Sequence, residues 1–185
     1  MATGNTLSRS LHDVGLAAWF GGSLMGAVGV NGAAGEVEDP RQRARVANEG
    51  WSRWTPVNLA AIVAHLLGGA WLTWGNKGRI GGQQGVAGAT MVKGGLMLAA
   101  LGATAYARAL GQKVIDAGDV PVEGGTQPSG ATPPEVEQAQ NQLHVLQWAI
   151  PALTGAMLVV GALMGEQQRP THVARGMLSR ALPNR

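Results

Sequence analysis

Four mainly apolar segments separated by polar connections dominate the pattern of this 185-residue chain. The clearest is 54–76, which carries no fixed charge and has about the length that a helix needs to cross a bilayer. Similar segments are predicted at 11–32, 88–110 and 142–165. Soluble helices show polar residues once or twice per turn, so such runs favour burial in lipid. The sequence therefore predicts an all-α fold, a four-helix transmembrane bundle. The alternative is a soluble bundle rich in glycine and alanine.

The connections have distinct compositions. The first, 33–53, is charged, and Pro40 fits the first turn of a short surface helix with Asp39 as its cap. The turn 77–87 is short and rich in glycine, which favours antiparallel neighbours. Gly, Pro, Thr and acidic residues fill 111–134, so we expect a flexible extramembrane loop there. The chain ends in a basic tail, 166–185.

Tryptophans and prolines mark the expected ends of the spans. Four tryptophans flank the segment 54–76 in pairs, as in an aromatic belt at two water–lipid boundaries: Trp51, Trp54, Trp71 and Trp74. Pro56 fits the first turn of this helix.

The segment 88–110 has only a short uncharged middle, Gly94 to Ala107. Lys93 and Arg108 lie inside its ends, so it spans a bilayer only if both long side chains snorkel to the headgroups. In the last segment, Pro151 is expected to kink the helix, which begins with polar residues after Pro134.

Small residues recur every four positions within all four segments. This pattern lets membrane helices approach closely, and two literal GxxxG sequences occur at 22–26 and 161–165. We predict close helix contacts at Gly22, Gly26, Ala64, Gly68, Gly95, Ala99, Ala103, Gly161 and Gly165.

Charge and composition bound the environment and the partners. The net charge is +3, and the basic residues gather at the ends of apolar segments, which favours anionic lipid over nucleic acid as partner. Arg9, the 77–87 turn and the tail put most basic residues on one side, so we expect both termini in the cytoplasm and a multi-pass protein of the inner (plasma) membrane. The chain has no cysteine, which excludes disulfides and thiolate metal sites.

Histidines are the candidate cofactor ligands. His65 lies near the middle of a predicted span, where an ionisable group suggests a functional site by default. His12 is expected near the cytoplasmic face and His144 toward the outer face, so no two histidines share a depth suited to axial ligands of haem. The alternative for His65 is a neutral imidazole bonded to a neighbouring helix. We predict no cofactor, with haem or copper bound by His65, His12 or His144 as the alternative.

No motif of an enzyme is present. The chain contains no GxxxxGK[ST], HExxH, GxSxG or CxxC sequence, so it is not expected to be a hydrolase or a nucleotide-dependent enzyme.

The stretch from Leu11 to Gly22, LHDVGLAAWFGG, resembles the "LH…W-[LF/I]-G-G" start of small bacterial membrane proteins related to the copper-resistance D membrane domain. The chain is also similar to uncharacterised four-span membrane proteins of high-GC actinobacteria. The resemblance implies a copper-related role, for which His12 would be the residue carried over.

The leading functional hypothesis is a non-catalytic membrane protein that acts by association, as a homo-oligomer or as an accessory subunit of a membrane complex. The first alternative is a haem- or metal-binding bundle for redox chemistry or copper handling. The second is a small-solute transporter, which the expected kink at Pro151 suggests.

Overall fold

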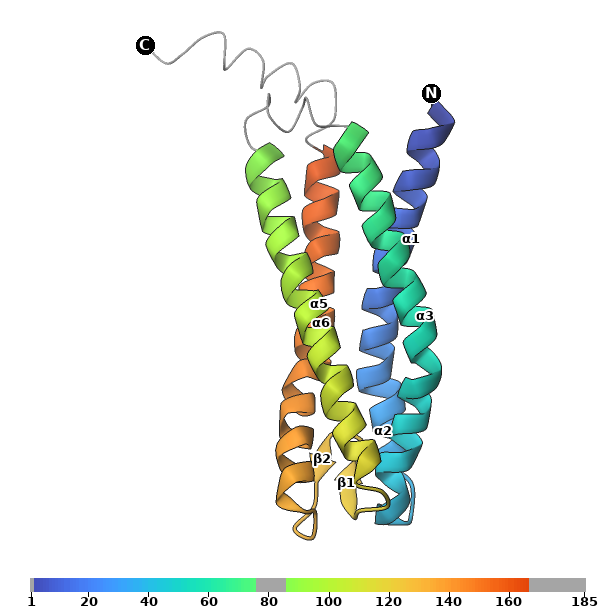
Figure 1. The fold of residues 1–185 in the computed structure, drawn as a ribbon, viewed down its shortest axis with the longest axis vertical. Helices are drawn as coiled ribbons and strands as arrows, with labels where there is room; N and C mark the ends of the chain where they lie inside the picture. Colours follow the sequence, from blue (N-terminus) through green and yellow to red (C-terminus); the bar gives the residue numbers. More distant parts are fainter. Residues whose placement is uncertain (1, 76–85, 167–185) are drawn as a thin grey trace, which may run out of the picture.

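The computed structural model describes residues 2–75 and 86–166, and this part of the chain is mostly helical. Four long helices run alternately up and down side by side (Figure 1): α1 (Ala2–Met25), α3 (Pro40–Gly75), α5 (Val86–Asp116) and α6 (Pro134–Glu166). Within the described ranges, three helical stretches are long and apolar enough to cross a membrane: Thr6–Gly35, Pro40–Gly75 and Pro134–Gly165. The prediction of a helical membrane protein is confirmed to this extent, and α5 falls outside the three.

The first predicted segment begins earlier than expected. Helix α1 starts at Ala2 and not near residue 11, and it continues through a π-helical stretch (η1, Gly26–Val30) into α2 (Asn31–Gly35). The polar residues before Leu11 are helical because they pack beside the end of α3, where the buried Ser8 lies against Gly68. Ser8 therefore lies inside the helix.

Helix α3 is one continuous helix of 36 residues. A cap at Asp39 is confirmed, since the Asp39 carboxylate accepts a hydrogen bond of 3.0 Å from the backbone N–H of Arg41. The predicted division into a surface helix and a separate span beginning near Trp54 is wrong, because Pro56 lies inside the helix and not in its first turn. A proline removes only one backbone hydrogen bond, and packing against α1 supports the helix on both sides of it.

The predicted flexible loop at 111–134 is wrong as well. Helix α5 runs on to Asp116, and the chain then forms a hairpin of β1 (Val122–Gly124) and β2 (Gln127–Pro128) that pair antiparallel. Val122 is fully buried in an apolar cluster with Ala44, Leu110, Val114, Val136 and Ala139. Glycine and proline correctly indicated a break in helix here, but the apolar contacts of Val122 and hydrogen bonds from Arg43 and Gln140 to the main chain hold the hairpin against the helices.

The helices form two closely packed pairs, α1 with α3 and α5 with α6, and α1 also contacts α6. The main core lies between the pairs and consists of Leu16, Trp19, Ile62, Ala100, Ile150 and Met157. Contacts between α3 and α5 are sparse, which leaves this side of the bundle the least closely packed. Many large apolar side chains, such as Leu67 and Leu98, face outward, as expected of helices surrounded by lipid.

Candidate functional site

His12 of α1 and His65 of α3 stack face to face near the end of the bundle where the chain begins. Their ring centroids lie 3.9 Å apart, with an angle of 18° between the ring planes. Each Nδ1 donates a hydrogen bond of 2.8 Å to the main-chain carbonyl oxygen of the other histidine. Because a carbonyl oxygen only accepts, both rings carry a hydrogen on Nδ1, and in a neutral ring Nε2 then presents a lone pair.

Glycines let the two helices come close enough for this exchange. A Cβ atom on Gly68 would lie 2.5 Å from the carbonyl oxygen of Ser8 and 2.6 Å from the backbone nitrogen of His12. A Cβ on Gly15 would lie 2.7 Å from the backbone nitrogen of His65 and closer still to the carbonyl oxygen of Ala61. The sequence H-x-x-G at 12–15 thus meets H-x-x-G at 65–68 in a local two-fold arrangement. We call His12, Gly15, His65 and Gly68 the histidine clasp.

The expectation that no two histidines lie at the same depth is therefore wrong. The error comes from the start of α1: since the helix begins at Ala2, His12 lies in its third turn, level with His65 on the antiparallel helix. The H-x-x-G pattern occurs in both segments and could have indicated this contact. It does so only if the two segments are assumed to pair antiparallel.

Lys93 of α5 reaches the clasp from the other helix pair. Its Nζ donates a hydrogen bond of 2.8 Å to Nε2 of His12, so the predicted snorkelling of this side chain to the headgroups is wrong. The Nε2 atom of His65, whose side chain is 0% exposed, has no hydrogen-bond partner among the described residues. One lysine thus breaks the local symmetry of the two rings.

The clasp does not fit a haem held between its two histidines. Axial ligands approach the iron from opposite faces of the haem, whereas these rings lie in van der Waals contact and use both Nδ1 atoms on backbone carbonyls. His144 is exposed and lies elsewhere, with its Nδ1 3.1 Å from Nε2 of Gln147 and 3.4 Å from Oγ1 of Thr126. Among the described residues, no group of three or more His, Cys, Asp or Glu side chains is placed to hold a metal ion.

Two of the predicted interfacial tryptophans point into the bundle. A Cβ on Gly22 would overlap the ring of Trp54, and one on Gly26 would overlap the ring of Trp51. The aromatic-belt interpretation of Trp51 and Trp54 is therefore wrong, since Gly22 of α1 and Gly26 of η1 leave room that these indoles fill. By contrast, Trp71 is 67% exposed, as the aromatic belt requires.

The remaining small residues predicted at helix contacts have varied surroundings. Gly68 is buried in the clasp, and Ala64 beside it is half-buried. A Cβ on Gly161 would lie 3.5 Å from Nζ of Lys93. Ala103 is half-buried. Three of the predicted residues are exposed, namely Gly95, Ala99 and Gly165.

Polar side chains connect the helix pairs below the clasp. Asn31 donates to Oε1 of Gln147 at 2.8 Å and accepts a hydrogen bond of 2.8 Å from Nε1 of Trp51. The indole N–H of Trp19 donates to Oγ1 of Thr104 at 3.3 Å. These bonds tie α2 to α3 and α6, and α1 to α5, and they lie next to a cavity.

The cavity has a volume of about 370 Å³ and extends from Trp19 at the core to the hairpin residues Gly125 and Thr126. Three indoles line it, those of Trp19, Trp51 and Trp54, together with apolar side chains of all four long helices. Mainly apolar walls with a few polar groups are typical of sites for small molecules.

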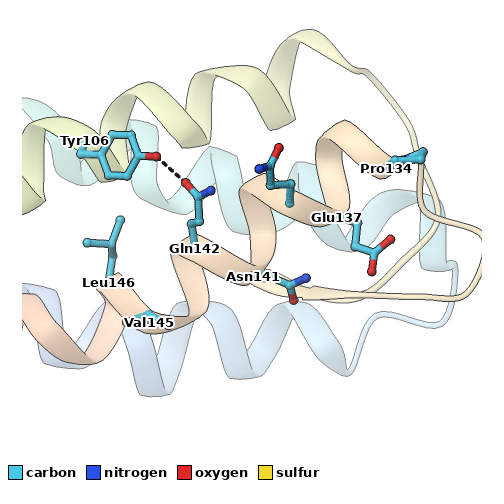
Figure 2. A pocket seen from close by; sticks show the side chains of 8 residues that line it. Tyr106, Pro134, Glu137, Asn141, Gln142, Val145 and Leu146 are labelled. Atoms are coloured by element: carbon cyan, nitrogen blue, oxygen red, sulfur yellow. Dashed lines mark hydrogen bonds between the residues drawn. The ribbon is translucent and has the colours of Figure 1, made fainter.

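A second hollow, on the outer surface between α5 and α6, is bordered mainly by polar side chains. Figure 2 shows Tyr106 of α5 pointing toward Gln142 of α6, to whose Oε1 it donates a hydrogen bond. Glu137 and Asn141 lie farther along α6, and both are exposed. None of the polar side chains that border this hollow is buried, in contrast to those of the internal cavity.

Comparison with known proteins gives no relative: no family model, no curated protein and no solved structure matches this chain.

Proposed function

We infer that this chain is a four-span membrane protein that works without catalysis, by association with a second copy or as an accessory subunit of a membrane complex. Helix α5 is the fourth span in this proposal. The arrangement of α5 alongside three apolar helices of similar length supports it, as does the internal hydrogen bond of Lys93, which removes one charge from contact with lipid.

The outward face of α5 is the observation that carries the proposal. Small residues recur on it every seven positions, at Gly88, Gly95, Gly102 and Ala109, and all four are exposed. None of these three glycines has a described neighbour within 4 Å of the place where a Cβ would lie. A seven-residue repeat of small side chains lets a second helix approach closely along a left-handed crossing.

The lysine inside α5, which lies outside the three clear spans, points the same way. A helix with a charged residue in its apolar part gains from protein neighbours, which replace lipid on its outer surface. Glycines at the contact let the two backbones approach closely. The helices then gain dispersion contacts and interhelical hydrogen bonds that mobile lipid does not provide.

Both termini lie in the cytoplasm in this proposal, and the membrane is the inner (plasma) membrane. The start of α1 lies at the same end of the bundle as the end of α3 and the start of α5 (Figure 1). Arg9 belongs to this end, and by sequence the 77–87 turn and the basic tail extend from it. Positive residues favour the cytoplasmic side.

Replacing Gly95 and Gly102 together by leucine tests the association. We expect the protein purified in mild detergent to have a mass above that of the 19.0 kDa monomer, or to retain a partner subunit. The G95L/G102L variant should purify as a monomer without that partner. The matched control is Gly21→Leu on α1, an exposed glycine that also has no neighbour within 4 Å. A wild-type protein that purifies as a lone monomer with no copurifying partner would refute the proposal.

A further inference from the structure

Two residues that line the internal cavity between the helix pairs each have a buried polar atom without a hydrogen-bond partner among the described residues. The indole Nε1–H of Trp54 and the amide Oδ1 of Asn58 are both buried, and neither has a hydrogen-bond partner among the described residues. Both residues line the cavity. An unmade hydrogen bond in a buried place is costly, so such atoms indicate that something else binds there.

The spacing of these two residues defines what could satisfy them. Trp54 and Asn58 are separated by four positions on α3, so they are neighbours on one face of the helix, one turn apart. A single hydroxyl group matches this pair, because its oxygen accepts from the indole N–H while its hydrogen is donated to the amide oxygen.

The walls and the volume of the cavity favour a flat ring. The rings of Trp19 and Trp51 join that of Trp54 in the lining, and aromatic rings stack favourably on one another. A cavity of about 150 Å³ is enough for benzene, so about 370 Å³ holds a two-ring compound with a substituent.

The way into the cavity lies between α3 and α5, where contacts are sparse. The exposed residues of the lining belong to these two helices and are Ser52, Leu59, Ala105, Arg108 and Ile115. In the four-span arrangement proposed above, Leu59 and Ala105 at this opening face lipid, so a compound that enters there must be soluble in the membrane.

From these features we propose that the cavity binds a lipid-soluble aromatic alcohol, a flat ring of the phenol or hydroquinone class, with its hydroxyl between Trp54 and Asn58. The ring packs among the indoles, and an alkyl tail, where the compound has one, leaves between α3 and α5. This binding is independent of association through α5.

Matched ligands test the role of the hydroxyl. The full-length protein in mild detergent is titrated with 1-naphthol and with 1-methoxynaphthalene, which has the same rings but no hydroxyl hydrogen. We expect 1-naphthol to bind at least about tenfold more tightly, the ratio that corresponds to 1.4 kcal/mol. In Asn58→Leu, which removes the acceptor, this preference should disappear while the fold, followed by circular dichroism, is kept.

Two further variants separate a specific site from partition into detergent. Trp54→Phe keeps an aromatic ring but removes the indole N–H, so it should weaken the binding of both compounds, whose oxygen accepts from that group. Ala107→Phe should fill the cavity and abolish the binding of both. Equal affinity of the wild-type protein for the two naphthalenes would overturn the proposal. Unchanged binding in all three variants would also overturn the proposal. That outcome is expected if both compounds only dissolve in the detergent and water alone occupies the cavity.

Discussion

Replacing Gly68 by alanine is the most direct test of the close contact between α1 and α3. The new Cβ would lie 2.5 Å from the carbonyl oxygen of Ser8 and 2.6 Å from the backbone nitrogen of His12. Both neighbours are backbone atoms of a helix, so neither can turn away as a side chain could. The helices must separate, and the two reciprocal hydrogen bonds of His12 and His65 lengthen with them.

The expected loss of stability follows from three contributions. Forcing an extra carbon into a packed contact costs about 1–3 kcal/mol. Losing two hydrogen bonds costs about 1 kcal/mol each. Alanine favours a helix over glycine by about 1 kcal/mol, which offsets part of this. The free energy of unfolding should therefore fall by about 2–4 kcal/mol, and Tm by roughly 5–15 °C for a chain of this size.

The assay is thermal unfolding in mild detergent, followed by circular dichroism, with Gly21→Ala as the control. Gly21 lies on α1 and has no neighbour within 4 Å, so alanine there brings the same helical preference without a clash. We expect G21A to unfold at or slightly above the temperature of the wild type. Equal Tm values for G68A and G21A would refute the close approach of the two helices at the clasp.

Two further substitutions address the polar ties and the position in the membrane. Asn31→Ala removes a donor to Gln147 and an acceptor for Trp51, so it should lower the free energy of unfolding by about 1–3 kcal/mol; an equal loss on replacing the exposed Asn141 would show the bonds to be unimportant. In liposomes, brominated lipid should quench the fluorescence of a variant that keeps only Trp71, which is 67% exposed, far more than one that keeps only Trp19, which is 0% exposed. Similar quenching of the two would contradict the burial of Trp19 in the core.

Much of the fold could be predicted because the absence of charge over long runs has few explanations other than lipid. The helical class and the last segment after Pro134 followed from hydrophobic pattern alone. The boundaries of α1 and α3 did not, because their polar ends pack against parts of the chain that are distant in sequence: the start of α1 against the end of α3, and the start of α3 against η1, α2 and the hairpin. The hairpin around Val122 was missed for the same reason, since its burial depends on three helices that are distant in the sequence.

The site was less predictable than the fold. His65 could be identified as a buried ionisable residue from its place in an apolar run, but its partner could not be found until the register of α1 against α3 was known. Lys93 was expected to reach outward, because a single sequence gives no sign of a buried acceptor on another helix. The same holds for Trp51 and Trp54, whose neighbours are glycines about 30 residues earlier in the chain.

The position of Lys93 in the chain has a consequence for how the protein is made. Synthesis runs from the amino end, so α1 and α3 are both translated before the lysine. His12, whose imidazole accepts a hydrogen bond from the ammonium group of Lys93, belongs to α1. The acceptor for the lysine of α5 is thus already part of the chain when α5 itself is translated.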